Sequence, residues 1–104
     1  MKIPSTIEIG GHVIEVVRKS DLIDHSEAYG LFDRTHMKIY LEESLGEGSL
    51  AWETFWHEVI EALNHFAEAD MEHKTIQTFG LLLHQVFASG FQKQAKRAKS
   101  RGDT

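Results

Sequence analysis

The stretch LAWETFWHEVIEALNHFAEA, residues 50–69, decides the fold because it predicts a long amphipathic helix. Its apolar residues recur at helical spacing and should face a core: Trp52, Phe55, Trp56, Val59, Ile60, Leu63 and Phe66. Polar residues occupy the opposite side of the helix and its flanks: His57, Glu58, Glu61, Asn64 and His65. Ser49 is the expected N-cap. The helix therefore needs a packing partner on one face and carries imidazoles and carboxylates on the other.

Before this helix the hydrophobic period is two, which is typical of strands. The segment TIEIGGHVIEVVRK, residues 6–19, predicts a β-hairpin because the central Gly-Gly pair can adopt positive φ. A second hairpin is predicted with strands at Tyr29–Phe32 and Lys38–Glu42, joined by a turn at residues 33–36. The polar segment 20–28 between the two hairpins is expected to be a loop.

A second helix should start near residues 70–72, after a short reversal of the chain at residues 68–70. Its apolar face is expected to contain Ile76, Phe79, Leu82, Leu83, Val86 and Phe87. Gly80 interrupts this helix. Because an interior glycine costs about 1 kcal/mol relative to alanine, Gly80 indicates that another backbone or side chain must come close.

These elements predict an α+β fold in which a small antiparallel β-sheet of two hairpins packs on two α-helices. A chain of 104 residues has room for one such domain, which we place at residues 1–92. Residues 93–104 should form a basic C-terminal tail, helical or frayed.

The composition restricts the kind of site that the domain can hold. The chain has no cysteine, so any metal must be bound by imidazole and carboxylate groups. The N-terminus lacks the pattern of a secretory signal, and no apolar run approaches the roughly 20 residues needed to span a bilayer. We therefore expect a cytoplasmic protein with no membrane partner.

Charge is unevenly distributed along the chain. The net charge is −5, but residues 93–104 hold five basic residues and one acidic residue, a local charge of +4. Residues 1–92 then carry 6 basic against 15 acidic residues, or −9. An acidic body argues against a broad nucleic-acid surface, because phosphate binding needs a basic face. The tail could contact phosphates, but we interpret it as a solvated chain end.

The start of WHEVIEALNHF resembles the zinc-peptidase motif H-E-x-x-H, with Glu61 in place of the second histidine. His57 and Glu61 lie four residues apart, about 6 Å along a helix, so both can reach one ion. His65 lies about 12 Å from His57 and is not expected to share that ion. The best third ligand is His73, at the start of the second helix.

Two histidines and one glutamate form a known catalytic zinc set. Glu58 follows His57 directly and would then be the general base. On spacing alone, the alternative is that these polar residues are only the solvent-exposed face of an amphipathic helix.

Five segments together resemble a group of small phage and prophage proteins, and more distantly the zincin-like metallopeptidases. The segments are IPSTIEIGG, KIYL, HEVIEALN, EHKTI and LLHQV, and they cover most of residues 3–87. In that pattern a glutamate at position 61 is normal. The resemblance implies a retained polar cluster on two helices, made of His57, Glu58, Glu61, Asn64, His73 and Gln85.

We therefore expect a phage-encoded, zincin-like protein that binds Zn²⁺ or another divalent metal through His57, Glu61 and His73. With Glu58 as general base it would hydrolyse peptides, and the strand Lys38–Glu42 would receive an extended peptide by β-augmentation. The alternative is a non-catalytic interaction protein with a relic metal site, whose acidic helix face binds a host or phage protein or forms a homodimer. A third hypothesis is a nucleic-acid accessory protein that acts through the tail.

Overall fold

The computed structural model describes residues 2–26 and 28–92, so the basic tail at 93–104 lies outside the described residues. The predicted α+β class is confirmed. The elements in chain order are β1 (Thr6–Ile9), β2 (His12–Lys19), α1 (Leu22–Ser26), β3 (Gly30–Asp33), β4 (Lys38–Glu42), the 3₁₀ helix η1 (Glu43–Leu45), α2 (Ser49–Ala67), α3 (His73–Val86) and the π-helical turn η2 (Phe87–Gln92). In this described part of the chain, no helix is long and apolar enough to cross a membrane.

Both predicted hairpins are present. β1 pairs antiparallel with β2, and β3 pairs antiparallel with β4. Gly10 and Gly11 form the first turn with φ of 57° and 82°, a conformation that is unstrained for glycine. In the second turn the Asp33 side chain accepts hydrogen bonds from the backbone N–H groups of Thr35 and His36. Each hairpin is therefore specified by its own turn residues.

The prediction of an antiparallel sheet was wrong, because the four strands form a mixed sheet in the order β1-β2-β4-β3. β2 and β4 run parallel, with Val16 opposite Ile39. Parallel neighbours need a long crossover connection, and residues 20–37 supply it with α1 and β3. The segment expected to be a loop thus contains a short helix. As a result β4 lies inside the sheet and β3 forms an edge.

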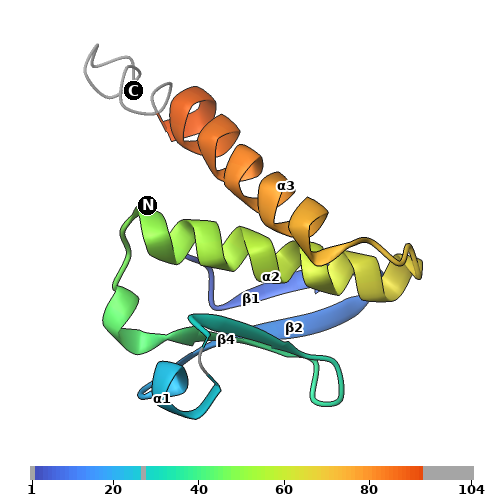
Figure 1. Ribbon diagram of the computed structural model, residues 1–104, viewed down its shortest axis with the longest axis horizontal. Helices are drawn as coiled ribbons and strands as arrows, with labels where there is room; N and C mark the ends of the chain where they lie inside the picture. The colour runs from blue at the N-terminus through green and yellow to red at the C-terminus, as the bar shows by residue number, and fades with distance from the viewer. Residues whose placement is uncertain (1, 27, 93–104) are drawn as a thin grey trace.

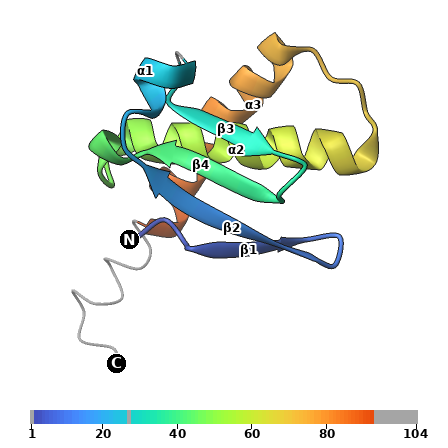
Figure 2. The same ribbon diagram turned by 90° about the horizontal axis from the view of Figure 1, so that it is seen from below.

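The molecule has three layers: the sheet, α2 and α3. α2 covers one face of the sheet, and α3 crosses α2 on the side away from the strands (Figures 1 and 2). The core lies between the sheet and α2, and its buried members are Ile3, Ile14, Ile39, Leu41, Ala51, Trp52, Phe55, Val59 and Ala62. α2 is therefore the central element, as its apolar pattern predicted.

The boundaries and burial of α2 differ from the prediction at a few positions. Gly48 is the N-cap, and Ser49 is the first helical residue. Leu63, which was expected in the core, is exposed, whereas Glu58 is buried. The reason is that the sheet covers the side of α2 that includes Glu58, and α3 leaves the side with Leu63 open.

The apolar face predicted for α3 is mostly exposed. Only Ile76 and Gly80 are buried in this helix, while Phe87, just after it, stacks on Trp52 with ring centroids 5.1 Å apart. The exposed side chains are Phe79, Leu81, Leu82, Leu83 and Val86. α3 is the outermost layer, so α2 covers one side of it and no described element covers the other.

Candidate metal centre

A tight reversal at residues 68–72 turns the chain from α2 back into α3. Glu68 and Asp70 adopt left-handed backbone conformations, with φ of 51° and 52°, which are uncommon outside glycine. The Asn64 side-chain oxygen accepts a hydrogen bond of 2.9 Å from the backbone N–H of Met71, and the Asn64 carbonyl accepts one from Ala69. Asn64 therefore stabilises the reversal through two hydrogen bonds. The reversal in turn places His73 over α2.

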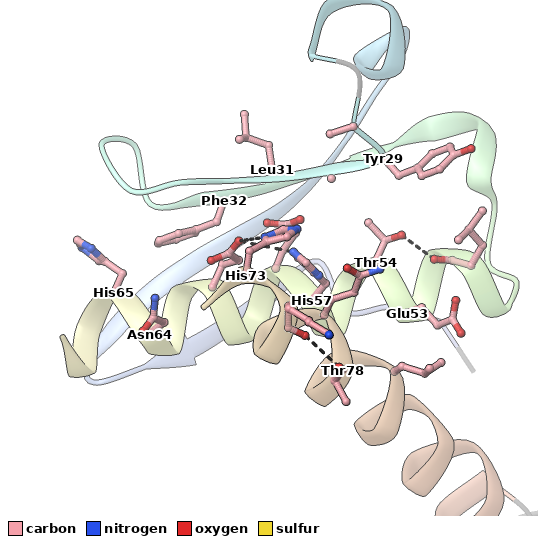
Figure 3. A pocket seen from close by; sticks show the side chains of 18 of the residues that line it. Tyr29, Leu31, Phe32, Glu53, Thr54, His57, Asn64, His65, His73 and Thr78 are labelled. Atoms are coloured by element: carbon pink, nitrogen blue, oxygen red, sulfur yellow. Dashed lines mark hydrogen bonds and ion pairs between the residues drawn. The ribbon is translucent and has the colours of Figure 1, made fainter. Parts of the chain in front are cut away.

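The structure brings together the three residues predicted as ligands, His57, Glu61 and His73. Figure 3 shows His57 and His73 beside each other, with ring centroids 5.0 Å apart. Glu61 Oε2 lies 3.5 Å from His57 Nε2 and 3.7 Å from His73 Nδ1. The ligand atoms all lie within 4.8 Å of one another. Adjacent ligand atoms around a tetrahedral zinc ion are about 3.3 Å apart, so small side-chain rotations would bring the three ligand atoms to that spacing and leave the fourth position open. The geometry fits one divalent metal.

The protonation state of His57 suits a metal ligand. Burial lowers the pKa of His57, the nearby His73 lowers it further, and Glu61 opposes the shift. Only the neutral imidazole can bind a metal. His73, by contrast, has a side chain that is 72% exposed, so this side of the cluster is open to solvent.

Glu58 of α2 lies beside the ligand set but does not belong to it. Its side chain is buried where α2 packs against β3. Burial raises the pKa of its carboxyl group to about 8, and the negative charge of Glu61 adds to the rise. The backbone N–H of Phe32 donates a hydrogen bond to Glu58 and limits the shift. At neutral pH this carboxyl group therefore holds a proton for most of the time.

Gly30 makes room for Glu58 under the edge strand. A Cβ atom at position 30 would lie 2.6 Å from Thr54 Cγ2 and 3.1 Å from Glu58 Oε2. Gly30 and the backbone of Phe32 were not among the residues predicted for the site. A glycine inside a strand pattern often marks a close approach, so Gly30 carried a signal that could have been used.

An open groove of about 1230 Å³ runs past these residues (Figure 3). Residues of β3 line one side of it, and residues of α2 and α3 line the other. His57, Glu58, Glu61 and His73 all line it. Apolar side chains line it as well, among them Tyr29, Leu50 and Leu81. The groove thus joins the ligand cluster to an apolar surface along β3 and α2.

The remaining polar candidates do not join the cluster. His65 packs against Phe32 and Phe66, with ring centroids 5.8 and 5.3 Å away. His84 is half-buried near the end of α3, and Gln85 is exposed beside it. Asn64 lines the groove, but its amide oxygen is used in the reversal. Of the six residues that the resemblance implies, four therefore surround the candidate metal position.

Comparisons with protein-family models, with curated proteins and with solved structures each gave no match to this chain.

Proposed function

We propose that this chain is a small phage-encoded, zincin-like protein that binds one divalent metal, best suited to zinc, and hydrolyses peptides in the host cytoplasm. The observation that supports it is the convergence of His57 and Glu61 of α2 with His73 of α3. Two imidazoles and one carboxylate suit zinc, which leaves a fourth position for water or substrate. Zinc in such a site acts as a Lewis acid and makes water acidic enough to react near neutral pH.

Glu58 is the residue proposed to move protons. In peptide hydrolysis a bond forms between the water oxygen and the carbonyl carbon, and the C–N bond breaks. Glu58 would accept the proton of the water and pass it to the leaving amine. Its raised pKa of about 8 lies close to the neutral range in which a general acid–base group works best.

The peptide would bind to β3, not to the strand Lys38–Glu42 as the sequence suggested. That strand is β4, and both of its edges are occupied by β2 and β3. Among the described residues β3 pairs with β4 alone, so the backbone groups at its other edge, apart from the Phe32 N–H that Glu58 accepts, could pair with an extended chain. Residues of β3 line the groove, which would place a bound peptide next to Glu58.

One observation favours the second candidate, a non-catalytic interaction protein with a relic metal site. Burial raises the pKa of Glu58 to about 8, so at neutral pH only a minor fraction of this carboxyl group is ionised and able to act as a base. In that case the groove would bind a peptide or protein partner without cleaving it. The nucleic-acid role of the tail concerns residues outside those described.

The deciding experiment uses protein purified without a histidine tag. Metal content is measured by mass spectrometry, and cleavage is measured on a pool of unstructured peptides with and without added zinc. The proposal predicts about one metal per chain and zinc-dependent cleavage. Glu58→Gln should keep the metal and the fold but lose roughly 10²- to 10⁴-fold in rate.

His84→Gln is the matched control, because His84 belongs neither to the ligand set nor to the residues that line the groove. It should retain both metal and turnover. A zinc-loaded protein that cleaves nothing in the pool would support the interaction protein instead. Cleavage that survives Glu58→Gln unchanged would refute the proposed role of Glu58.

A further inference from the structure

The groove that contains the candidate metal ligands has two different ends, with the ligands between them. Tyr29 and Glu53 lie on one side of His57, and Asn64 and His65 lie on the other (Figure 3). All five residues line the groove. A ligand that lies along the groove therefore meets a different surface on each side of the metal position.

Large apolar side chains gather at the end with Tyr29. Leu50 lies in the first turn of α2, and Leu81 follows Gly80, which packs against the main chain of His57. Tyr29, Leu50 and Leu81 line the groove and are 46%, 45% and 45% exposed. Contact with an apolar group of a ligand would remove this surface from water, which is favourable. We call these three residues the apolar end.

The opposite end of the groove is positively charged. Arg34 comes directly after β3, two residues beyond Phe32, which packs against His65. Lys74 follows His73 in the first turn of α3, next to the reversal. Both cations are exposed and line the groove, and neither forms an ion pair with another described residue. Because residues 1–92 hold only 6 basic residues against 15 acidic ones, this pair stands out. We call Arg34 and Lys74 the basic end.

The edge of β3 offers backbone hydrogen bonds between the two ends. The Tyr29 carbonyl accepts a hydrogen bond of 2.8 Å from the Glu42 N–H, so the backbone of Tyr29 faces β4. Backbone groups alternate in direction along a strand, so those of Gly30 and Phe32 face the other edge. The Phe32 N–H accordingly donates to Glu58. The remaining groups, the Gly30 N–H and the carbonyls of Gly30 and Phe32, could pair with an extended chain.

We propose that the groove binds the carboxyl-terminal segment of an extended peptide, with the terminal carboxylate at the basic end and a large apolar side chain at the apolar end. This inference rests on the proposed function, because it names the substrate class of the same groove. Arginine suits a carboxylate, since its planar fork can donate two parallel hydrogen bonds. Glu53, which is half-buried beside the apolar end, would repel a carboxylate there and so sets the direction of the peptide.

The length of β3 indicates that the carboxylate belongs to a chain end. β3 stops at Asp33, and the chain then turns back toward β4, so no strand edge remains to pair with a peptide beyond Arg34. The four residues from Gly30 to Arg34 span about 13 Å in an extended chain. The apolar side chain should therefore lie about four residues before the terminal carboxylate.

Binding of labelled hexapeptides, followed by fluorescence anisotropy, tests the proposal on the full chain. A chelator is present, so that no outcome depends on metal or on cleavage. The parent peptide carries a fluorophore at its N-terminus, leucine at its second position, serine and glycine elsewhere, and a free terminal carboxylate. A C-terminal amide should weaken binding at least about tenfold, because it removes a charge-assisted hydrogen-bonded pair. Glycine in place of leucine should weaken binding at least about fivefold.

Variants of the protein assign each preference to one end of the groove. Arg34→Gln should abolish the preference for the carboxylate over the amide, and Lys74→Gln should reduce it. Binding of the amide peptide should not change, which shows that the fold is retained. Lys2→Gln is the matched control, because Lys2 is exposed but does not line the groove.

Leu81→Ala should abolish the preference for leucine over glycine. Leu82→Ala is its control, because Leu82 is 47% exposed but lines the other groove between α2 and α3. Equal binding of the carboxylate and amide peptides would overturn the proposal. A preference that Arg34→Gln leaves unchanged would overturn it too, as would the absence of binding by any peptide at about 1 mM.

A further peptide distinguishes a chain end from an acidic side chain. It ends in aspartate with a C-terminal amide, and it should bind as weakly as the plain amide. If it binds as tightly as the free carboxylate, the basic end recognises an acidic side chain and the proposal is wrong. A protein that binds no zinc but shows both preferences would refute the proposed function and support this inference.

Discussion

Gly80 of α3 lies directly against the main chain of His57 in α2. A Cβ atom at position 80 would be 3.1 Å from both Cα and N of His57, closer than an ordinary van der Waals contact. This contact lets the two helices cross at close range. His73 lies seven residues earlier in α3, about 10 Å along the axis, and the reversal brings it to Glu61. The candidate metal site thus depends on a glycine that binds nothing itself.

Gly80→Ala should destabilise the fold although alanine is the better helix former by about 1 kcal/mol. Overpacking against a backbone costs about 1–3 kcal/mol, so a net loss of roughly 1 kcal/mol is expected, together with weaker zinc binding. Urea unfolding and a zinc titration measure the two effects. Gly90→Ala is the control, because a Cβ at position 90 meets nothing within 4 Å. Equal stabilisation by both substitutions would contradict the role assigned to Gly80.

Replacing any one of His57, Glu61 and His73 by alanine should weaken zinc binding by at least about 100-fold. Loss of a residue that only supports a ligand already costs 10- to 100-fold, and these residues are proposed to be ligands. Competition with a chromogenic zinc chelator gives the affinities. His65→Ala and His84→Ala should leave the affinity nearly unchanged, and a comparable loss in either would show that the ligand set is wrong.

Zinc affinity should also fall as the pH drops below about 6.5, because histidines must be neutral to bind a metal. Burial lowers the pKa of His57, so this residue stays neutral to a lower pH than an ordinary histidine. The same chelator competition at pH 5, 6 and 7 measures the dependence. An affinity that does not change between pH 5 and 7 would exclude histidine ligands.

Glu58 should make the free energy of unfolding fall as pH rises. Its pKa is raised from 4.5 to about 8 in the folded protein, so between these values the folded state holds a proton that the unfolded chain has released. In that range the free energy of unfolding falls as the pH rises, by on the order of 1 kcal/mol for each pH unit. Its favourable contribution is complete below pH 4.5 and lost as the pH rises through about 8.

Glu58→Gln removes this titration while keeping the shape of the side chain. Urea unfolding of both proteins is measured at pH 5, 6, 7 and 8 with a chelator present. At each higher pH the free energy of unfolding of the variant should increase relative to that of the wild type. Two parallel curves would mean that Glu58 is not buried in solution as it is in the structure.

Asn64→Ala should loosen the start of α3. The substitution removes the acceptor of the Met71 N–H, and such a loss costs about 1 kcal/mol. Zinc affinity should fall as well, because His73 follows directly after the reversal. Asn64→Asp keeps an oxygen acceptor and should restore both properties in large part. If Asn64→Ala leaves zinc affinity unchanged, then the reversal does not position His73.

The sequence by itself determined the local structure. Alternation of apolar residues specified the strands, Gly10 and Gly11 specified the first turn, and a helical period specified α2. The four-residue spacing of His57 and Glu61 is a property of any helix, so these two could be paired before the fold was known. The absence of cysteine limited the ligands to nitrogen and oxygen. All of these depend on residues that are close together in the chain.

Only the tertiary structure decided which segments meet. Strands with the same alternation can pair in either direction, so nothing local showed that β2 and β4 run parallel or that β3 is an edge. Glu58 was expected on the polar flank of α2, but the path of β3 buries it and raises its pKa. The apolar pattern of α3 showed a face that needs covering, but not whether this chain or another molecule covers it. Burial depends on contacts between distant segments, and a local pattern contains no information about them.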